Sequence, residues 1–524
     1  MGINVVLRPF PGKLPADGYI RGTVRAVFSG VSRSGSIPRG TVMPIQPLVD
    51  AATAAAAMAD IKPALSPQEA RVEAARCLFC FDAPCIMACP TGIDIPAFIK
   101  KIATDNVTGA ARTILEANVL GASCARVCPT QVLCEGACVM LDLEKDPIQI
   151  GRLQRHATDH VADRGIQVLH APQVKNGKRV AVIGAGPAGL GCAAELARLG
   201  YSVTVYDKKP AGGGLNTYGI AYYKMRPEVS IEEVRMIERL GVEFRTGVEV
   251  GRDVEAADLQ RDHDAIFLGI GLGAANRLGI PGEDLPEVVD ALDFIEWIHT
   301  RPLAEVPVGR RVAVLGCGNT AIDAVTQALR LGAEKATVIY RRGPDDMSAY
   351  DFEYELAKTD GAGFLFHTAP VEVLGAGGHV TGLRLTRTEV RDGRAMVVAG
   401  SEWTEPFDMV LKAVGQEKQT DLLRRLVPGL KLDARGRVEH DPATMRTSVP
   451  TVFAGGDCTS GGREVVNAVA EGKKAARGIH HLLGGGPVSG PVQPSRHGVA
   501  GVPVGSGFDQ PIRVHELEAA LQRG

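Results

Sequence analysis

Short runs of β-branched apolar residues alternate with helical patterns through most of this chain. The clearest unit has a strand pattern over residues 179–183, a helical pattern over 187–199 and a second strand pattern over 203–206. A unit of the same kind begins at Arg311, with its second strand over 336–340. Strands that alternate with helices predict parallel sheets with crossover helices. The pattern therefore predicts an α/β fold that contains two such units.

Three glycines follow the first strand of the first unit in the spacing GxGxxG. Gly184 allows a tight turn, Gly186 allows the backbone to approach a pyrophosphate, and Gly189 allows the helix to pack on the strand. The N–H groups at the start of that helix would face the phosphates. Asp207 ends the second strand, where an acid can accept hydrogen bonds from ribose hydroxyls. Together these features predict a Rossmann-like dinucleotide site.

Two further glycine-rich stretches are candidates for the same site. In the first, Gly213, Gly214 and Leu215 would let the backbone lie close to a flat ring system. The second is a short apolar strand that ends in Gly456 and Asp457, where the acid suits the linker of a dinucleotide. The first could also be a flexible surface loop, and Asp457 could also be a helix N-cap.

The second unit repeats the strand, the glycine turn and the helix. Its turn residues are Gly316, Gly318, Asn319 and Thr320. Its second strand ends in Arg341 and Arg342 instead of an acid. Arginine suits the 2′-phosphate of NADPH, although two solvated surface charges would give the same pattern. The acids Asp345 and Asp346 follow at once and weaken the case for NADPH, so the choice of coenzyme stays open.

A region with helical patterns precedes both units and holds most of the cysteines. Ser66, Pro67 and Glu69 form a capping box with proline at the first helical position, which predicts a helix into Cys77. A helical stretch is also expected over 95–120. The eight cysteines of this region, out of eleven in the chain, are Cys77, Cys80, Cys85, Cys89, Cys124, Cys128, Cys134 and Cys138.

The cysteine spacing predicts two 4Fe-4S clusters. Three close cysteines followed by Cys-Pro are typical of the bacterial ferredoxin run, in which the cysteine before proline ligates the other cluster. We therefore expect Cys89 to cross from the trio Cys77, Cys80 and Cys85 to a second group, and Cys138 to cross back. The alternatives are structural zinc, which also uses cysteine pairs, and thiols without a metal.

Composition narrows the class of protein. The 524 residues are 45% hydrophobic and 23% charged with a net charge of −2, so no global field indicates nucleic acid or membrane binding. No apolar run reaches the roughly 18 residues of a membrane span. Clustered cysteines without a secretory signal favour a cytoplasmic metalloprotein. Residues 1–60 are expected to be a disordered extension or the product of a misassigned start codon, and residues 484–524 a flexible tail.

Over residues 60–485 these motifs, in this order, resemble one known module. It is shared by the small subunit of glutamate synthase and the N-terminal half of dihydropyrimidine dehydrogenase, which in bacteria is a separate subunit. The resemblance implies a helical iron–sulfur domain followed by two Rossmann-like domains, the second inserted in the first. The implied limits are 61–172 for the iron–sulfur domain, 173–286 with 418–483 for the FAD domain, and 287–417 for the NAD(P)H domain.

The resemblance also implies where each cofactor would bind. FAD would lie on the first glycine turn, Asp207, the loop at 213–215 and Asp457, and the nicotinamide cofactor on the second turn, the arginine pair and Gly415. The second cluster would be held by Cys89, Cys128, Cys134 and Gln154, because the pyrimidine enzymes place a glutamine ligand at the position of Gln154. We therefore expect that Cys124 is not a ligand.

The function implied is the electron-input subunit of bacterial NAD-dependent dihydropyrimidine dehydrogenase. NAD(P)H would reduce FAD, and the clusters would pass electrons to an FMN-containing barrel subunit that reduces uracil or thymine. The stretches 82–85 and 89–95 look like the pyrimidine enzyme. The alternatives are a glutamate synthase small subunit and a metal-stabilised binding protein without redox chemistry. We find no acid–base group for a pyrimidine, so no catalytic residue is predicted in this chain.

Overall fold

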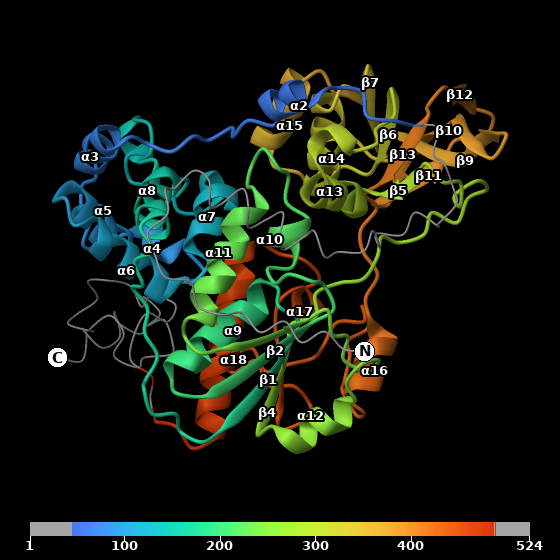
Figure 1. The fold of residues 1–524 in the computed structure, drawn as a ribbon. Coiled ribbons are helices and arrows are strands. Elements are labelled where there is room, and N and C mark those ends of the chain that lie inside the picture. The colour runs from blue at the N-terminus through green and yellow to red at the C-terminus, as the bar shows by residue number, and fades with distance from the viewer. Residues whose placement is uncertain (1–44, 487, 489–524) are drawn as a thin grey trace, which may run out of the picture.

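A computed structural model describes residues 45–486 and 488 of the chain. Figure 1 shows a helical domain beside two sheet-containing halves, one below the other in the view. The expected extension over residues 1–44 and nearly all of the expected C-terminal tail lie outside the described residues. None of the helices in the described part is both long and apolar enough to cross a membrane.

The lower half is a parallel five-stranded sheet with the strand order β14-β4-β1-β2-β3. Its strands are β1 (Arg179–Ile183), β2 (Ser202–Asp207), β3 (Glu243–Thr246), β4 (Ala265–Leu268) and β14 (Val452–Ala454). Its helices are α9 (Pro187–Arg198), α10 (Leu215–Tyr218), α11 (Pro227–Glu238), α12 (Ala256–Asp262), α16 (Thr420–Leu426), α17 (Asp457–Ser460) and α18 (Val465–Leu482). Figure 1 shows α9 and α18 lying together along this sheet.

The upper half is a second parallel sheet, with the strand order β5-β13-β6-β7-β8. Its strands are β5 (Val288–Asp290), β6 (Arg311–Leu315), β7 (Lys335–Ile339), β8 (Gly363–Leu365) and β13 (Met409–Lys412). An antiparallel sheet is attached, made of β9 (Thr368–Ala376), β10 (His379–Arg391), β11 (Arg394–Val397) and β12 (Trp403–Glu405). The helical elements are α13 (Ala291–Thr300), η3 (Leu303–Glu305), α14 (Asn319–Arg330), η4 (Pro344–Asp346) and α15 (Asp351–Thr359).

The insertion of one half in the other is visible in the chain order. All strands of the upper half lie in sequence between β4 and β14 of the lower sheet. The predicted fold class, a helical domain followed by two Rossmann-like units of which the second is inserted in the first, is confirmed.

Residues 61–172, all of them described, form helices and turns but no strand. The elements are α3 (Pro67–Ala75), α4 (Pro84–Met87), α5 (Ile95–Ala103), α6 (Val107–Ala117), α7 (Gly121–Val127), η1 (Thr130–Val132), η2 (Leu141–Leu143) and α8 (Ile150–Asp163). The predicted capping box at the start of α3 is present, because Ser66 Oγ accepts from Glu69 N and Ser66 N donates to Glu69 Oε2 at 2.7 Å. The buried residues of this domain form one continuous core with those of the lower half.

Two expectations differ from the structure. The single helical stretch predicted over 95–120 is the pair α5 and α6, because Asp105 takes a left-handed conformation (φ 63°) and Asn106 Oδ1 caps α6 by accepting from Gly109 N at 2.9 Å. The expected disordered extension does not reach residue 60. Residues 51–57 form α2 (Ala51–Ala57), and Ala54 and Met58 are buried in the core of the upper half.

Candidate functional site

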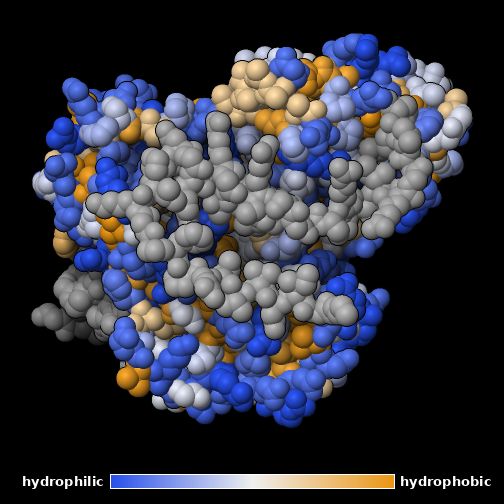
Figure 2. All heavy atoms as spheres, in the orientation of Figure 1, coloured by the Kyte–Doolittle hydropathy of each residue, from blue (hydrophilic) through white to orange (hydrophobic). Residues whose placement is uncertain are grey.

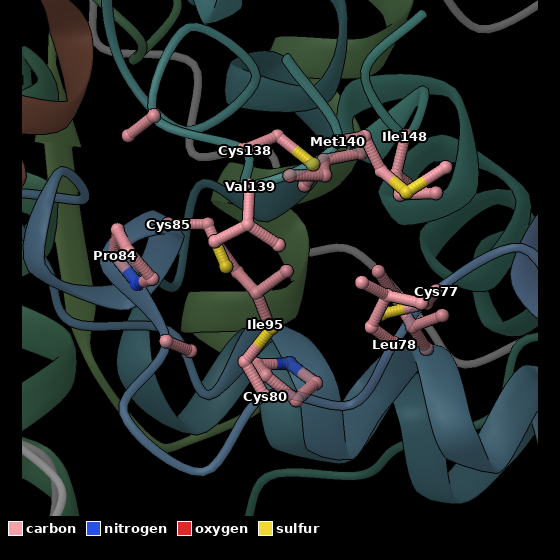
Figure 3. A pocket seen from close by; sticks show the side chains of 15 residues that line it. Cys77, Leu78, Cys80, Pro84, Cys85, Ile95, Cys138, Val139, Met140 and Ile148 are labelled. Carbon is pink, nitrogen blue, oxygen red and sulfur yellow. The ribbon is translucent and has the colours of Figure 1, made fainter. Parts of the chain in front are cut away.

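Four of the predicted iron–sulfur thiols surround one pocket. Cys77, Cys80 and Cys85 come from the loop after α3 and from α4, and Cys138 comes from the distant turn before η2. The pocket has an empty volume of about 370 Å³, and every other residue that lines it is apolar. Figure 3 shows these thiols among Leu78, Ile95, Val139 and Ile148. The structure thus brings Cys138 to the predicted trio across more than 50 residues of sequence.

The chemistry of this pocket fits an iron–sulfur cluster. Burial raises the pKa of the Cys85 thiol to about 12, so the free thiol would stay protonated at neutral pH. A metal that binds the sulfur removes that proton, and the apolar wall then controls potential and solvent access. No three His, Cys, Asp or Glu side chains in the described part of the chain converge closely enough for a single ion. The thiols are instead spread around a volume, as the ligands of a four-iron cube must be.

The other four cysteines form a second group, which is more deeply buried. Burial raises the pKa of the Cys128 thiol well above its usual range, and Cys124, Cys134 and Cys89 lie close enough to raise it further. Cys89, Cys124 and Cys134 are buried, and Cys128 is partly buried. This arrangement includes Cys124 in the group together with the three predicted ligands.

Gln154 lies on the helix that packs against the helix of Cys124. Gln154 lies on α8 and is 6% exposed, and its Nε2 donates to the carbonyl oxygen of Gly121 at 2.7 Å, one turn before Cys124 on α7. This hydrogen bond uses the Nε2 atom of the Gln154 amide and does not involve its Oε1 atom. The Cys124 sulfur accepts a hydrogen bond from Asn118 Nδ2 at 3.2 Å. Gln154 is therefore beside the second group, and which of the two residues is the fourth ligand stays a prediction.

Two buried side chains of the lower half hold the helical domain in place. Glu233 on α11 accepts from the backbone N of Ala122 and Ser123 at 2.8 and 2.9 Å, and also from Ser123 Oγ, at the start of α7. Burial raises the pKa of Glu233 to about 7, against the effect of these donors. Lys473 on α18 donates to the carbonyl oxygens of Glu116 and Ala117, at the end of α6. The second cysteine group therefore lies beside the lower half. No sequence motif marked either side chain.

The first glycine turn has the form expected of a dinucleotide site. Gly184 has φ 102°, and a Cβ atom there would lie 2.3 Å from the carbonyl oxygen of Gly269. A Cβ atom at Gly189 would lie 1.9 Å from the carbonyl oxygen of Gly184, so the helix can approach the strand only without a side chain. Beside Gly186, the N-cap of α9, there is open space. Space at a helix N-terminus in which backbone N–H groups are free suits a pyrophosphate.

The other predicted FAD residues gather around this turn. Asp207 Oδ2 accepts from Ala185 N at 2.7 Å, and burial raises the pKa of its carboxyl. Gly213 N donates to the carbonyl oxygen of Ala185 at 2.8 Å, and a Cβ atom at Gly214 would lie 2.8 Å from Gly186 Cα. A Cβ atom at Gly456 would lie 3.0 Å from that of Ala188 on α9. Asp457 follows at the first position of α17, and burial raises the pKa of its carboxyl.

The loop that follows Gly214 contains a polar residue that the sequence did not mark. Leu215 is partly exposed, whereas Asn216 beside it is fully buried. Neither Oδ1 nor Nδ2 of Asn216 has a hydrogen-bond partner among the described residues. A buried amide without partners is costly, and a bound ring system with polar edges would satisfy it. This orphaned amide supports the fit of a flavin to the loop.

The second glycine turn repeats the first on β6 and α14. Gly316 has φ 117°, and Gly318 is the N-cap of α14. Asn319 and Thr320 form the first turn of that helix, and Asn319 Oδ1 accepts from Tyr350 N at 3.0 Å. Gly415 has φ 83°, and the carbonyl oxygen of Ala413, two residues before it, lies against Gly316.

The arginine pair lies just beyond the end of β7. Arg341 is exposed, and Arg342 is partly buried. Arg342 Nη2 is 3.5 Å from the carbonyl oxygen of Gly393, and its buried Nε has no partner within the described residues. A free guanidinium donor beside the second turn fits an anionic group such as a phosphate.

Side chains also join the two halves near both turns. Lys224 of the lower half lies 2.6 Å from Asp323 and 2.6 Å from Glu353 of the upper half, and all three side chains are at least nine-tenths buried. Tyr350 of the upper half donates its hydroxyl to Glu464 Oε1, the N-cap residue of α18, at 2.5 Å. These pairs fix how the two glycine turns face each other. Sequence reasoning missed them because each is made by residues far apart in the chain.

Comparison with known proteins gives two family matches. The family described as dihydropyrimidine dehydrogenase domain II, 4Fe-4S cluster, matches residues 54–166. The family described as pyridine nucleotide-disulphide oxidoreductase matches residues 178–472. The boundary between the two matches falls where the helical domain meets β1.

The relatives belong to both branches that the motifs had suggested. The glutamate synthase (NADPH) small chain of Escherichia coli K12 is 37% identical over 79% of this chain and 92% of its own. That of Halomonas elongata is 38% identical over 83% of this chain and 95% of its own. The NAD-dependent dihydropyrimidine dehydrogenase subunit PreT of Escherichia coli K12 is 34% identical over 81% of this chain and 97% of its own. The predicted resemblance is confirmed.

Proposed function

Because this chain belongs to the pyridine nucleotide-disulphide oxidoreductase family, we propose that it is the electron-input subunit of a larger reductase. It would oxidise NAD(P)H and supply electrons to a partner flavin subunit that reduces uracil or thymine to the 5,6-dihydropyrimidine. The chain is an NAD(P)H oxidoreductase with FAD and 4Fe-4S centres. When bound, these groups supply two-electron hydride acceptance and one-electron transfer.

We infer which residues would hold each group. FAD would be held by the first glycine turn, Asp207, the loop at 213–216 and Asp457. The second glycine turn, Arg342 and Gly415 would hold the nicotinamide nucleotide. Cys77, Cys80, Cys85 and Cys138 would hold one cluster, and Cys89, Cys128, Cys134 and Gln154 the other.

The observation that carries the proposal is the order in which these sites lie. The upper half meets the lower half through Tyr350 and Glu464, and the backbone N of Tyr350 also donates to Asn319 of the second glycine turn. The second cysteine group lies against the lower half, where Glu233 fixes α7. The first cysteine group lines a pocket whose rim includes Leu78, which is 55% exposed. This order supports electron flow from the nicotinamide through the lower half to the surface of the helical domain.

Replacement of Cys80 by Ala tests this order. Loss of one ligand should disable the outer cluster, while the hydride step uses only the two glycine units. We expect flavin reduction by NAD(P)H to keep its rate and transfer to the partner to be abolished. Stopped-flow absorbance of the flavin measures the first, and NAD(P)H consumption by the complete enzyme measures the second. Cys192→Ala, at a buried cysteine of α9, is the matched control. A folded, FAD-loaded C80A protein that loses flavin reduction would contradict the order.

The ligands of the second cluster can be tested as a pair. We expect Cys124→Ser to keep its full iron content and both cluster signals in electron paramagnetic resonance. Gln154→Ala should change only one of the two clusters, since an amide oxygen carries one less negative charge than a thiolate and tunes the potential accordingly. The ligand assignment is wrong if C124S loses about four irons and Q154A loses none.

A second candidate is a glutamate synthase small subunit, favoured by the 37–38% identity of those chains against 34% for PreT. The pyrimidine enzyme is favoured by Gln154 and by the local sequences at 82–85 and 89–95. The complex purified with its native partner decides between them. Uracil-dependent oxidation of NAD(P)H would support pyrimidine reduction. Oxidation that depends on glutamine and 2-oxoglutarate, with none on uracil, would support glutamate formation instead.

A further inference from the structure

Large apolar side chains are exposed mainly on the helical domain. Among the described residues, most of the exposed large apolar side chains lie between Val72 and Leu143, and the others are scattered over the two larger halves. Figure 2 shows one face of the molecule, on which hydrophilic residues predominate and hydrophobic ones form small separate groups. The exposed residues of this domain are Val72, Leu78, Phe81, Met87, Val132, Leu141 and Leu143.

Four of them flank the first thiol pocket, and we call these four the apolar patch. Phe81 is 77% exposed, Leu78 55%, Leu143 53% and Leu141 44%. They lie on the segment 78–81, which carries Cys80, and on η2, whose first residue Leu141 donates its backbone N to the carbonyl oxygen of Cys138. Arg76 joins the loops, since its Nη2 donates to the carbonyl oxygen of Asp146 at 2.6 Å. The patch therefore lies beside the thiol pocket, and Leu78 belongs to both.

The rim of the patch is acidic. Asp82, Asp142, Glu144 and Asp146 are all exposed, and Lys145 is the exposed base among them. None of these four carboxylates forms an ion pair with another described residue. The Arg76 guanidinium lies near Asp146, but the other three acids add a negative field that attracts a basic surface.

We propose that the electron-accepting partner subunit docks on the apolar patch with an apolar surface ringed by lysine and arginine. The proposal rests on the function proposed above and names the surface through which electrons leave. A protein interface has an apolar centre with a charged rim, and complementary charge speeds the encounter. The patch has both parts, and it lies over the outer thiols, so a partner seated on it comes close to the electron donor.

A second copy of this chain is the weaker occupant. Two identical patches related by a two-fold axis would bring the acidic rims face to face. Like charges across an interface oppose association. A partner with a basic surface would meet no such repulsion, so the charge pattern favours a different protein over a second copy of this chain.

The test uses the full-length holoprotein and two electron acceptors. Cytochrome c is a basic protein that must dock, and ferricyanide is a small anion that can be reduced without docking. One NAD(P)H gives two electrons and so reduces two ferric haems, releasing NAD(P)⁺ and one proton. The electrons are therefore counted in the same way for both acceptors.

Two double variants change the patch. The apolar variant combines Phe81→Ser with Leu143→Ser, and the charge variant combines Asp142→Lys with Glu144→Lys. Each has a matched control at exposed sites elsewhere: Met396→Ser with Val397→Ser for the apolar variant, and Glu402→Lys with Asp421→Lys for the charge variant.

We expect both patch variants to raise the KM for cytochrome c at least about ten-fold, since charge and apolar contact both contribute to docking. The charge variant should also flatten the dependence of this rate on ionic strength. The ferricyanide rate and the control variants should match the wild type. In the complete two-subunit enzyme, the same patch variants should weaken subunit association by a similar factor.

Two outcomes would overturn the proposal. Wild-type rates with cytochrome c in both patch variants would show that electrons leave elsewhere. A wild-type dimer that dissociates on the same substitutions, seen by sedimentation, would assign the patch to a second copy. Failure of the proposed function would give a different result, because NAD(P)H would then reduce neither cytochrome c nor ferricyanide in the wild type or in any variant.

Discussion

The two glycine units have nearly the same backbone but end in different chemistry. A Cβ atom at Gly184 would lie 2.3 Å from the carbonyl oxygen of Gly269, and one at Gly316 would lie 2.3 Å from that of Ala413. Both turns have a glycine at the N-cap of the following helix. The repeated backbone indicates a common solution for the pyrophosphate.

The units differ at the end of their second strand. Asp207 is held over the first turn by Ala185 N and Lys209 N, at 2.7 and 2.8 Å. Arg341 and Arg342 follow β7 instead, and Arg341 is exposed. A fixed acid suits a resident nucleotide with free ribose hydroxyls, whereas an open basic pair suits one that exchanges and can carry a phosphate. The shared backbone of the two turns thus suits dinucleotides in general, and the residues at the end of the second strand suit one dinucleotide rather than another.

The largest effects should come from filling the two turns. Gly184→Ala should lose most of its FAD, because the new Cβ meets backbone that cannot move away. Gly316→Ala should keep its FAD but raise the KM for NAD(P)H at least ten-fold, since backbone strain of about 1–3 kcal/mol is expected at such a site. Flavin absorbance of the purified proteins and steady-state kinetics measure these effects.

Gly361→Ala is the control for this pair. It has φ 95°, but a Cβ atom there meets nothing within 4 Å. It therefore carries the strain of a left-handed residue without the backbone clash. If G184A and G316A lost the same cofactor, the division of labour between the two units would be refuted.

A smaller effect is expected from the arginine pair after β7, which should bind NADPH more tightly than NADH. Changing Arg341 and Arg342 together to Ala should raise the KM for NADPH and leave that for NADH little changed. A charge-assisted contact with the 2′-phosphate in a partly exposed site is worth about 1–3 kcal/mol, or roughly five- to 150-fold in KM. Equal changes for both coenzymes would show that the pair is only a solvated surface.

The two glycine units could be predicted because each depends on residues close together in sequence. The strand, the turn and the helix between Arg179 and Asp207 lie as the pattern indicates, and so does the capping box at Ser66. The break between α5 and α6 was missed because it depends on a left-handed Asp105, a conformation that composition does not mark. Sequence patterns over a few neighbouring residues therefore predict the structure of those residues, except where a backbone conformation has no mark in the sequence.

The contacts between domains could not be predicted in the same way. Glu233 fits the pattern of an ordinary surface acid on an amphipathic helix, and nothing near it in sequence shows that α7 covers it. The packing of residues 45–58 on the upper half has the same origin, because Ala54 and Met58 gain their burial from a core formed hundreds of residues later. Such contacts fix how the domains are placed relative to one another, although no sequence motif marks the residues that make them.

The smallest effect should come from Tyr350, which tests whether the two units work as one. Its hydroxyl donates to Glu464 across the two halves, and its backbone N donates to Asn319 of the second turn. Burial and the Glu464 carboxylate raise the pKa of Tyr350, so the hydroxyl keeps its proton and the contact should not vary with pH in the neutral range. Tyr350→Phe removes this contact and little else.

We expect Y350F to slow flavin reduction by NAD(P)H several-fold, with FAD content and the KM for NAD(P)H unchanged. A hydrogen bond to a charged group is worth about 1.5–3 kcal/mol, and partial exposure here reduces that to about 1 kcal/mol. The effect stays small because Lys224, with Asp323 and Glu353, still joins the halves. Tyr354→Phe, on α15 and with no hydroxyl hydrogen bond among the described residues, is the control. Single-turnover flavin absorbance separates the two variants. If Y350F and Y354F reduce flavin equally fast, the buried ion pairs of Lys224 alone set how the two units face each other.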